Sequence, residues 1–590
     1  MCKRFVDIIQ FVRAGRCAIA LLVSIGILFT SSSSSLAQAA DTSEKPKSGK
    51  AMLEKKCEIP DKYKKKWTEP EKWAWKEICA GRVANLNGER RAKVLNPINP
   101  KREILDFKQS KYDEKFLAKR TLSSRFLRTI LKTERFFSVD SLRGVWIMGA
   151  YFQDNIDLSG LSIERSLTIS HSRSQSGIVM RHFKASERAA FIASSFEGDI
   201  RIDTASFDDT LSIINVRFDS LSLKDTKING DLVASLSAYN SEFDMDVVSI
   251  KGDLYMARVK FFHVALKRVK VDGFFNMSDS KFKGKFDTSS LTVGDDLLMR
   301  DAQFDEPVML ESLTIQSDLD MRGATLSGLD LTGARITGNL RLGYRCKFDR
   351  SSCKDKEKKK IIWKNYIDSR KESHPPKLTL RNASFGSIIN TGDAWPPDLE
   401  LNGFTYKRFE SDESKTLSER GSDWFINWLA KDESYSPQPY LQLAGVLRNT
   451  GLGTIADDIL YQNRDEQRAD KKTQRFEWWR LSFLRWVYGY GYGRHIFWAL
   501  LQLAMILIAS GTFVIYIYIT ERRDRDLIIS GFRDSFWYSV DMLLPVMKLR
   551  EKHYEIDLET KPVRYYFHCH QIMGYLLIFF VIAGLTGLTK

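Results

Sequence analysis

The sequence predicts a mainly β protein: a right-handed parallel β-helix of about 21 residues per coil, followed by an α-helical hairpin and two transmembrane helices. Three observations carry this prediction. A short apolar motif recurs at a nearly constant spacing through the middle of the chain. Apolar residues then change to helical spacing, and two long apolar runs lie near the C-terminus.

Six related segments form the repeat. They begin at steps of 22, 21, 22, 22 and 21 residues, and each has further apolar residues four and six places after its first. In one unit, alternation places Leu254 and Met256 inside and Asp253 and Tyr255 outside. Such short alternating strands suit a parallel β-solenoid, whose coils stack their apolar residues. The segments begin at Ile228, Ile250, Val271, Val293, Ile315 and Ile336.

Each repeat consists of two similar halves, because Phe196, Phe207 and Phe218 stand eleven residues apart. We expect the solenoid over 141–410, with a charged insertion at 346–376 that forms a surface loop. Acidic residues recur at one register of the coil, as turn or outward ladder positions require, whereas catalytic acids would occur once. These acidic residues are Asp231, Asp253, Asp295, Asp296 and Asp318.

Residues 1–39 predict a secretory signal peptide, because basic residues precede an apolar run and a small-residue cleavage site. The alternative is an uncleaved membrane anchor. We expect cleavage after Ala39 and export to an oxidising compartment. There, local cysteine pairs are more often disulfides than metal ligands. The candidate disulfide residues are Cys57 with Cys79, and Cys346 with Cys353.

Residues 40–140 predict a disulfide-stapled N-terminal cap for the solenoid. Trp67, Trp73 and Trp75 lie inside the loop that a Cys57–Cys79 bridge would close. We expect them to pack in the cap, and a tryptophan-lined sugar site is the alternative.

Residues 411–470 predict a helical hairpin that closes the other end of the solenoid. Tyr440, Leu443 and Leu447 recur at helical spacing, and Pro437 and Gly451 mark where one helix starts and stops. This segment is similar to one repeat of a tetratricopeptide-like array. A single hairpin suits a cap better than a peptide-binding groove.

The C-terminal part predicts a membrane anchor. Residues 497–519 and 572–588 are apolar enough to span a bilayer, and the more polar 527–549 suits an amphipathic or re-entrant helix. Residues 471–496 mix arginines and aromatics, as an interfacial segment does, and the Tyr-Gly repeat 488–493 reads as an elbow before the first span. The predicted interfacial anchors are Trp478, Trp479, Trp486, Tyr488, Tyr490 and Tyr492.

Two cues predict the orientation. The signal peptide places the solenoid outside the cytoplasm, and the loop 520–568 between the spans carries nine lysines and arginines, as cytoplasmic loops do. We therefore expect a bacterial inner-membrane protein with its repeat domain in the periplasm. A net charge of +16 favours anionic lipid headgroups or acidic envelope polymers as partners, and export argues against nucleic acid.

Residues near the membrane segments raise three further hypotheses: a metal site, a haem site and an ion channel. His568, Cys569 and His570 could ligate a metal, but snorkelling at the interface explains them as well. His495 and His570 fall on opposite sides of the membrane, too far apart to share a haem. In a two-helix channel, a filter would fall at 543–548, where a proline and a lysine would oppose cation passage.

The segments Gly403–Tyr406 (GFTY) and Pro437–Ala444 (PQPYLQLA), with the repeats and the membrane tail, carry one resemblance. In these parts the chain resembles uncharacterised bacterial envelope membrane proteins with pentapeptide-like repeats. The rhythm near Ala324–Leu329 is similar to the Ala-x-Leu-x-x of pentapeptide-repeat proteins, whose quadrilateral β-helix has four five-residue sides. Members are often labelled membrane-associated oxidoreductases, which makes that activity an alternative.

The function predicted is a membrane-anchored periplasmic scaffold whose solenoid binds envelope proteins or anionic glycans. The sequence has no flavin, nicotinamide, haem or disulfide-exchange motif. We therefore predict no cofactor and no catalytic, cofactor-binding or metal residue. The alternatives are a membrane-associated oxidoreductase, a glycan lyase and a degenerate two-helix channel.

Overall fold

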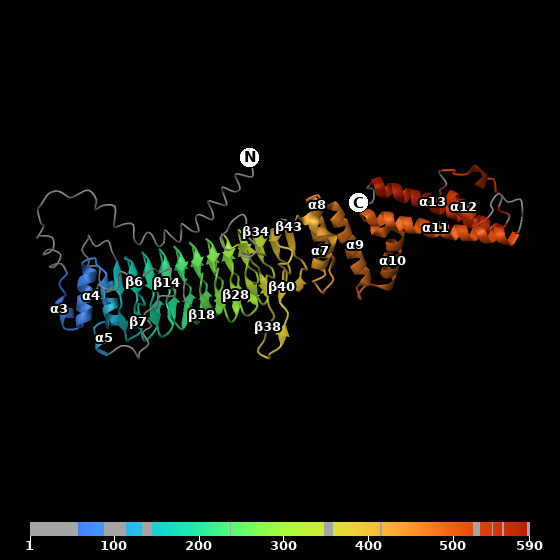
Figure 1. The fold of residues 1–590 in the computed structure, drawn as a ribbon. Coiled ribbons are helices and arrows are strands. Elements are labelled where there is room, and N and C mark those ends of the chain that lie inside the picture. Colours follow the sequence, from blue (N-terminus) through green and yellow to red (C-terminus); the bar gives the residue numbers. More distant parts are fainter. Residues whose placement is uncertain are drawn as a thin grey trace, which may run out of the picture. The chain divides into compact units, whose positions relative to one another are not determined.

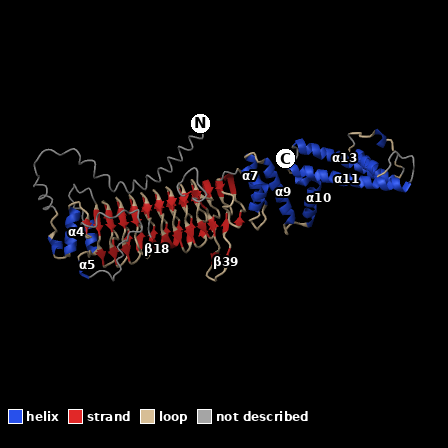
Figure 2. Cartoon of the chain, viewed as in Figure 1, coloured by secondary structure: helices blue, strands red, loops and turns tan. Residues whose placement is uncertain are grey.

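The computed structural model describes residues 57–87, 114–132, 144–235, 238–346, 358–412, 416–522, 531–544, 547–556, 558 and 560–586. Within these ranges the chain forms a parallel β-solenoid followed by helices (Figures 1 and 2). The predicted signal peptide 1–39 lies outside the described residues. Cys353 does too, so the Cys346–Cys353 bridge stays a prediction.

The solenoid has about 11 turns of about 22 residues, and its stacked strands repeat at the steps of 21 and 22 residues seen in the sequence. Each turn is built from short strands such as β9 (Lys184–Ala185), β10 (Ala189–Ile192), β11 (Ser195–Phe196) and β12 (Ile200–Asp203). Every strand pairs in parallel with its counterpart one turn away, so equivalent side chains stack. One inward row is completely buried and forms the spine of the core. It contains Leu211, Leu232, Leu254, Phe275, Leu297, Leu319 and Leu340.

The half-turn of eleven residues has a backbone cause. A residue with positive φ recurs at His171, His182, Ala193, Thr204 and Asn215, which makes one left-handed corner in each half-turn. A repeat built strictly from five-residue units has ten residues in each half-turn and would not include this eleventh residue. The left-handed conformation costs a non-glycine residue roughly 1–2 kcal/mol, which the stacked apolar rows must offset.

The N-terminal cap covers the first turn. Helix α4 (Glu69–Cys79) packs beside α6 (Ser124–Lys132) through the ring of Trp67, whose centroid lies 5.0 Å from that of Phe126. Glu71 is buried and its carboxylate accepts the hydroxyl of Ser123 at 2.6 Å, which joins the two helical segments. Strand β1 (Ala84–Asn85) then pairs with β2 (Val145–Met148) and extends the sheet. Cys57 and Cys79 form a disulfide.

Trp67 and Trp75 are buried in this cap, as the packing interpretation expects, whereas Trp73 is exposed. The cap also contains the short helices α3 (Asp61–Lys64) and α5 (Glu114–Ala118).

The charged insertion is not one continuous loop. After β34 (Arg335–Arg341) the chain leaves the solenoid and pairs β35 (Arg345–Cys346) with β36 (Lys358–Lys359). It then rejoins the solenoid at β37 (Ile362–Trp363), which pairs in parallel with β32 (Thr325–Leu326). A second excursion forms the hairpin of β38 (Tyr366–Ile367) and β39 (Ser373–His374). Trp363 lies 37 residues beyond its ladder partner Leu326, so the regular spacing that identifies the other turns is broken here.

Three helices close the end of the solenoid: α7 (Leu417–Leu429), α8 (Pro437–Asn449) and α9 (Gly453–Ala469). Helix α8 lies on the last strand, β43 (Thr405–Ser411). Gln438 accepts the N–H of Gly403 at 3.0 Å and donates to the carbonyl of Phe404 at 2.8 Å. Gln442 donates to the carbonyl of Tyr406 at 2.6 Å. The two sequence segments GFTY and PQPYLQLA therefore meet, and the second caps the backbone of the first.

The C-terminal helices are α10 (Arg475–Tyr488), α11 (Gly493–Arg522), α12 (Phe532–Leu543) and α13 (Lys561–Thr586). Among the described residues, two helices are long and apolar enough to cross a membrane, over Gly493–Glu521 and Lys561–Ala583. Both begin before the apolar runs that predicted them. Helices α11, α12 and α13 contact one another (Figure 1).

Candidate functional site: a buried polar cluster around helix α12

Helix α12 packs between the two candidate membrane spans and runs antiparallel to α11. Its first residue, Phe532, contacts Tyr516 near the end of α11, and its last, Leu543, joins an apolar cluster with Leu500 near the start. Between them, the Ser539 hydroxyl donates to the carbonyl of Ile508 at 2.9 Å. Ile508 is the central residue of the predicted span 497–519. Helix α12 therefore lies alongside α11 from near its C-terminal end to near its N-terminal end.

Asp541 organises the chain that follows α12. Its carboxylate is completely buried and accepts the backbone N–H groups of Leu549 and Arg550 at 2.9 and 3.0 Å. Nδ1 of His553 lies 2.9 Å from the same carboxylate and donates to it. The Tyr554 hydroxyl donates to the Asp541 carbonyl at 2.9 Å. Residues 547–556, called the return segment below, are thus fixed to α12 by one carboxylate.

A second polar contact joins α12 to α13. Nε2 of His570, which is buried, lies 3.1 Å from the carbonyl oxygen of Ser539 and donates to it. Gly511 of α11 faces this contact, and a Cβ there would lie 2.3 Å from the Ser539 hydroxyl. The approach therefore requires glycine on α11. Nδ1 of His570 is buried and has no hydrogen-bond partner among the described residues.

The three neighbouring residues His568, Cys569 and His570 do not converge. His570 points into the bundle, while His568 and Cys569 are exposed. His495 lies elsewhere, 2.8 Å from Asp458, whereas His570 lies beside Gly511. Sixteen residues of helix separate 495 from 511, which is about 24 Å. These histidines form no common ligand set.

Helix α10 presents an aromatic stripe. Phe476, Trp479, Phe483 and Trp486 are exposed and recur at intervals of three and four residues, so they share one helix face. Such a face, with arginines beside it, suits the headgroup layer of a membrane. Trp479 and Trp486, and the partly exposed Trp478, are among the predicted interfacial anchors, whereas the two phenylalanines were not predicted, although the same helical spacing identifies them.

Of the three tyrosines predicted as interfacial anchors, Tyr488 and Tyr490 make side-chain contacts with other helices at the elbow between α10 and α11. Gly489 and Tyr490 have positive φ, which turns the chain from one helix to the next. The Tyr490 hydroxyl donates to Asp465 of α9 at 3.1 Å, and the ring of Tyr488 packs against Phe580 of α13. Tyr492 is half-buried.

The recurring acidic residues of the solenoid bond to backbone. Oδ1 of Asp231 accepts the N–H of Asp253, and Oδ1 of Asp253 accepts the N–H of Phe274, each one turn further on. Asp296 and Asp318 are joined in the same way. Burial raises the pKa of Asp253. These carboxylates stand at one register in successive turns and bind the backbone of the next turn. This agrees with the turn or outward ladder role that their spacing predicts.

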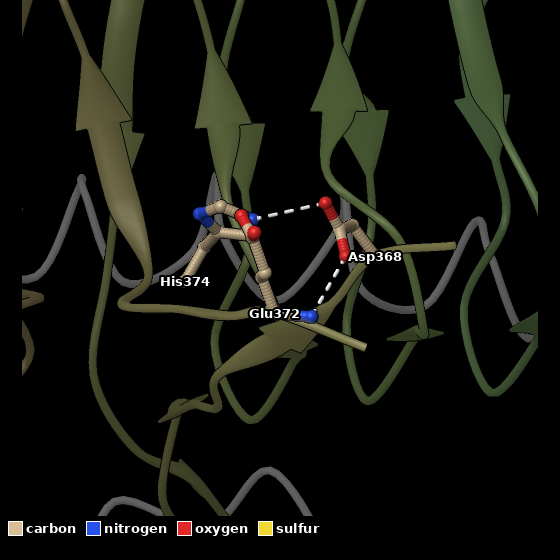
Figure 3. A group of neighbouring side chains, drawn as sticks. All are labelled: Asp368, Glu372 and His374. Atoms are coloured by element: carbon tan, nitrogen blue, oxygen red, sulfur yellow. Dashed lines mark hydrogen bonds and ion pairs between the residues drawn. The ribbon is translucent and has the colours of Figure 1, made fainter. Parts of the chain in front are cut away.

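Asp368, Glu372 and His374 form a small cluster on the β38–β39 hairpin (Figure 3). Oδ1 of Asp368 accepts the N–H groups of Arg370 and Glu372 at 2.9 and 2.8 Å, and Nε2 of His374 lies 3.4 Å from Oδ2. The Glu372 N–H and the His374 ring lower the pKa of Asp368. An Asp side chain that bonds backbone two residues on is ordinary turn chemistry. We assign the cluster to the hairpin turn.

Comparison of the chain with protein-family models, with curated proteins and with solved structures finds no match in any of the three.

Proposed function

We propose that this chain is a bacterial inner-membrane scaffold whose right-handed β-solenoid stands in the periplasm and binds an extended envelope partner. A signal peptide at 1–39, α10 lying in the headgroup layer and two spans, α11 and α13, would provide export and anchoring. The resemblance to envelope membrane proteins with pentapeptide-like repeats agrees with this role.

The observation that carries the proposal is an uncharged outward row on the solenoid. Its residues stack over eight successive turns, and the next position is Asp320, which is buried and paired with Arg300 and Arg322. Strand alternation places these side chains on the side of the strand opposite the core, where five of them are half-buried and Ala190, Ser212 and Leu298 are buried. A long, regular and uncharged row suits contact with an extended polymer rather than a compact ligand. The row contains Trp146, Thr168, Ala190, Ser212, Val233, Tyr255, Asn276 and Leu298.

A lysine row flanks it. Lys184, Lys227 and Lys270 occupy one outward position in every second turn, with Ser206 and Ser249 between them. Stacked strands are about 4.8 Å apart, so the ammonium groups repeat at roughly 10 Å. All three lysines are exposed. This spacing suits a polymer with regularly placed acidic groups, and we therefore favour an anionic glycan over an envelope protein as the partner.

Co-sedimentation with purified cell-wall glycan tests the proposal. Replacing Lys184, Lys227 and Lys270 with glutamine should weaken binding and reduce its salt dependence. The matched control replaces Lys260, Lys281 and Lys285, which lie in other outward rows, and so changes the net charge equally. Equal losses from both triple variants would contradict the glycan proposal.

In-cell photo-crosslinking from Tyr255, compared with Asp287 on another side, tests for an envelope protein as the partner. Reporter fusions after residue 420 and at the C-terminus test the topology. A cytoplasmic signal from the first fusion would contradict the periplasmic location.

A further inference from the structure

We propose that the N-terminal cap holds a binding site for one sugar ring, built around the exposed indole of Trp73. The inference takes the glycan named in the proposed function as its ligand, and so it rests on that proposal. The site is an open hollow of about 410 Å³ beside helix α4. It is lined by Glu69, Pro70, Trp73, Leu86, Ala118 and Lys119.

Trp73 differs from the other two tryptophans of the disulfide loop. Trp67 and Trp75 are buried, and the ring of Trp67 stacks on that of Tyr63 with 5.0 Å between the centroids. Trp73 is 41% exposed, and its indole N–H donates to no residue that the structure describes. A tryptophan side chain has a large apolar surface, so leaving it in water forfeits stabilisation that burial in the cap would have supplied. Its exposure therefore points to contact with a ligand.

Helix α4 presents this ring from a fixed position. Glu69, Pro70 and Trp73 are its first, second and fifth residues, so their side chains share one helix face. The helix begins with a capping box of Thr68 and Glu71, and the disulfide of the cap ties its last residue. A ring that is already held in place loses little conformational freedom when a ligand stacks on it.

The other side of the hollow comes from two segments that are joined to each other. Leu86 directly follows β1, whereas Ala118 is the last residue of α5 and Lys119 follows it. The guanidinium of Arg120 donates to the side chain of Asn87, which links the two segments. Both sides of the hollow are thus held by contacts within the cap.

The polar groups at the rim of the hollow match a sugar. The carboxylate of Glu69 accepts the Lys72 ammonium at 2.8 Å, and this hydrogen bond lowers the pKa of Glu69, so the carboxylate is ionised at neutral pH. The Lys119 side chain is exposed and makes no ion pair within the part of the chain that the structure describes. An aromatic face takes the C–H side of a pyranose ring, while a carboxylate accepts from its hydroxyl groups and an ammonium donates to them. The volume of the hollow also falls in the range of small-molecule sites.

The hollow lies beside the start of the uncharged row on the solenoid. Asn85 of β1 pairs with Met148 of β2, and Trp146, two residues before Met148, is the first member of that row. Leu86 is therefore offset from Trp146 by three residues along the strand direction, which is about 10 Å. A glycan bound along the row has the hollow within its reach, and the Lys119 ammonium suits an acidic substituent on it.

Isothermal titration calorimetry with the full-length chain in lipid nanodiscs tests the site. The probe is a short soluble fragment of cell-wall glycan freed of its peptide stems, and the stems alone are a second probe. Trp73→Ala should weaken binding of the sugar fragment about fivefold or more, because the stacked ring is lost, and Trp73→Tyr should restore most of the affinity. Phe262→Ala, which removes an exposed ring from β21 (Lys260–Lys267), is the control and should leave the affinity unchanged. Binding of the stems only, no binding by the parent chain, or equal affinity of Trp73→Ala and the parent chain would overturn the proposal.

Ala118→Phe provides the second measurement. The added ring fills the hollow and leaves Trp73 in place, so binding of the fragment should be lost while thermal denaturation matches that of the parent chain. Retained binding would overturn the proposal.

The two glycan proposals fail separately. Replacing Lys184, Lys227 and Lys270 with glutamine should weaken sedimentation with the polymer and leave the short fragment bound. If the parent chain binds the fragment through Trp73 but does not sediment with the polymer, the solenoid proposal is wrong and the sugar site stands. Sedimentation without binding of the fragment gives the opposite result.

Discussion

Nδ1 of His553 lies 2.9 Å from the carboxylate of Asp541, and both side chains are buried. A buried aspartate is expensive unless it is paired, and here the imidazole and two backbone N–H groups surround it. The carboxylate therefore keeps the return segment against α12.

Asp541→Asn should release the return segment. The amide group cannot accept from all the donors that surround the carboxylate, and breaking a buried pair costs about 3–5 kcal/mol. We expect a lower unfolding temperature in detergent and faster tryptic cleavage at Lys548, Arg550 and Lys552. Glu555→Gln, an exposed acid in the same segment, is the control. Cleavage as slow as in the parent chain would show that the carboxylate does not hold the segment.

Gln438→Ala should open the end of the solenoid. The substitution leaves the N–H of Gly403 and the carbonyl of Phe404 without the partner that caps them, at a cost of about 1–3 kcal/mol. Hydrogen exchange at the Gly403 amide should accelerate, and β43 should unfold at a lower temperature. Leu441→Ala, on the exposed side of the same helix, should change neither. Unchanged exchange at Gly403 would refute the capping role.

The solenoid could be predicted from sequence because parallel turns bury the same register again and again. Leu232, Leu254 and Phe275 are visible as a period and stack in the structure. Where the period breaks, prediction failed: Trp363 rejoins the ladder inside a stretch expected to be a loop.

The polar cluster around α12 had no sequence pattern to reveal it. Asp541 and His553 meet across an irregular segment, and His570 reaches Ser539 from another helix. Such contacts depend on how the helices pack against one another. The spacing of residues along the sequence does not reveal that packing. The aromatic stripe of α10 is different, because Phe476 and Phe483 follow helical spacing and could have been found.

Val247→Gly should stabilise the solenoid. Val247 has a φ of 57°, a left-handed conformation in which a β-branched side chain is strained. Removing that strain should raise the free energy of unfolding by about 1 kcal/mol. Asn215→Gly is the matched control, because asparagine at φ 54° tolerates this conformation and should change little. Thermal denaturation followed by circular dichroism compares them. A destabilised Val247→Gly chain would show that the valine contributes packing instead.

Asp320 should make the solenoid sensitive to acid. Burial favours the protonated carboxyl, but hydrogen bonds and charge from Arg322 and Arg300 outweigh it and lower the pKa from 3.8 to about 2. Both guanidinium groups reach the carboxylate, at 2.8 and 2.6 Å. Because the folded pKa lies below the unfolded one, the stabilisation is complete above about pH 4 and is lost as the pH falls towards 2.

The shift of Asp320 corresponds to roughly 2 kcal/mol. Asp320→Asn should remove this pH-dependent part of the unfolding free energy and leave two arginines without their buried counter-ion. The variant should thus be less stable at neutral pH, and its stability should fall less steeply between pH 4 and 2. Asp287→Asn, at an exposed outward position, should follow the parent curve. Denaturant titrations at several pH values measure these slopes. Parallel curves for the parent chain and Asp320→Asn would show that the buried carboxylate does not set acid stability.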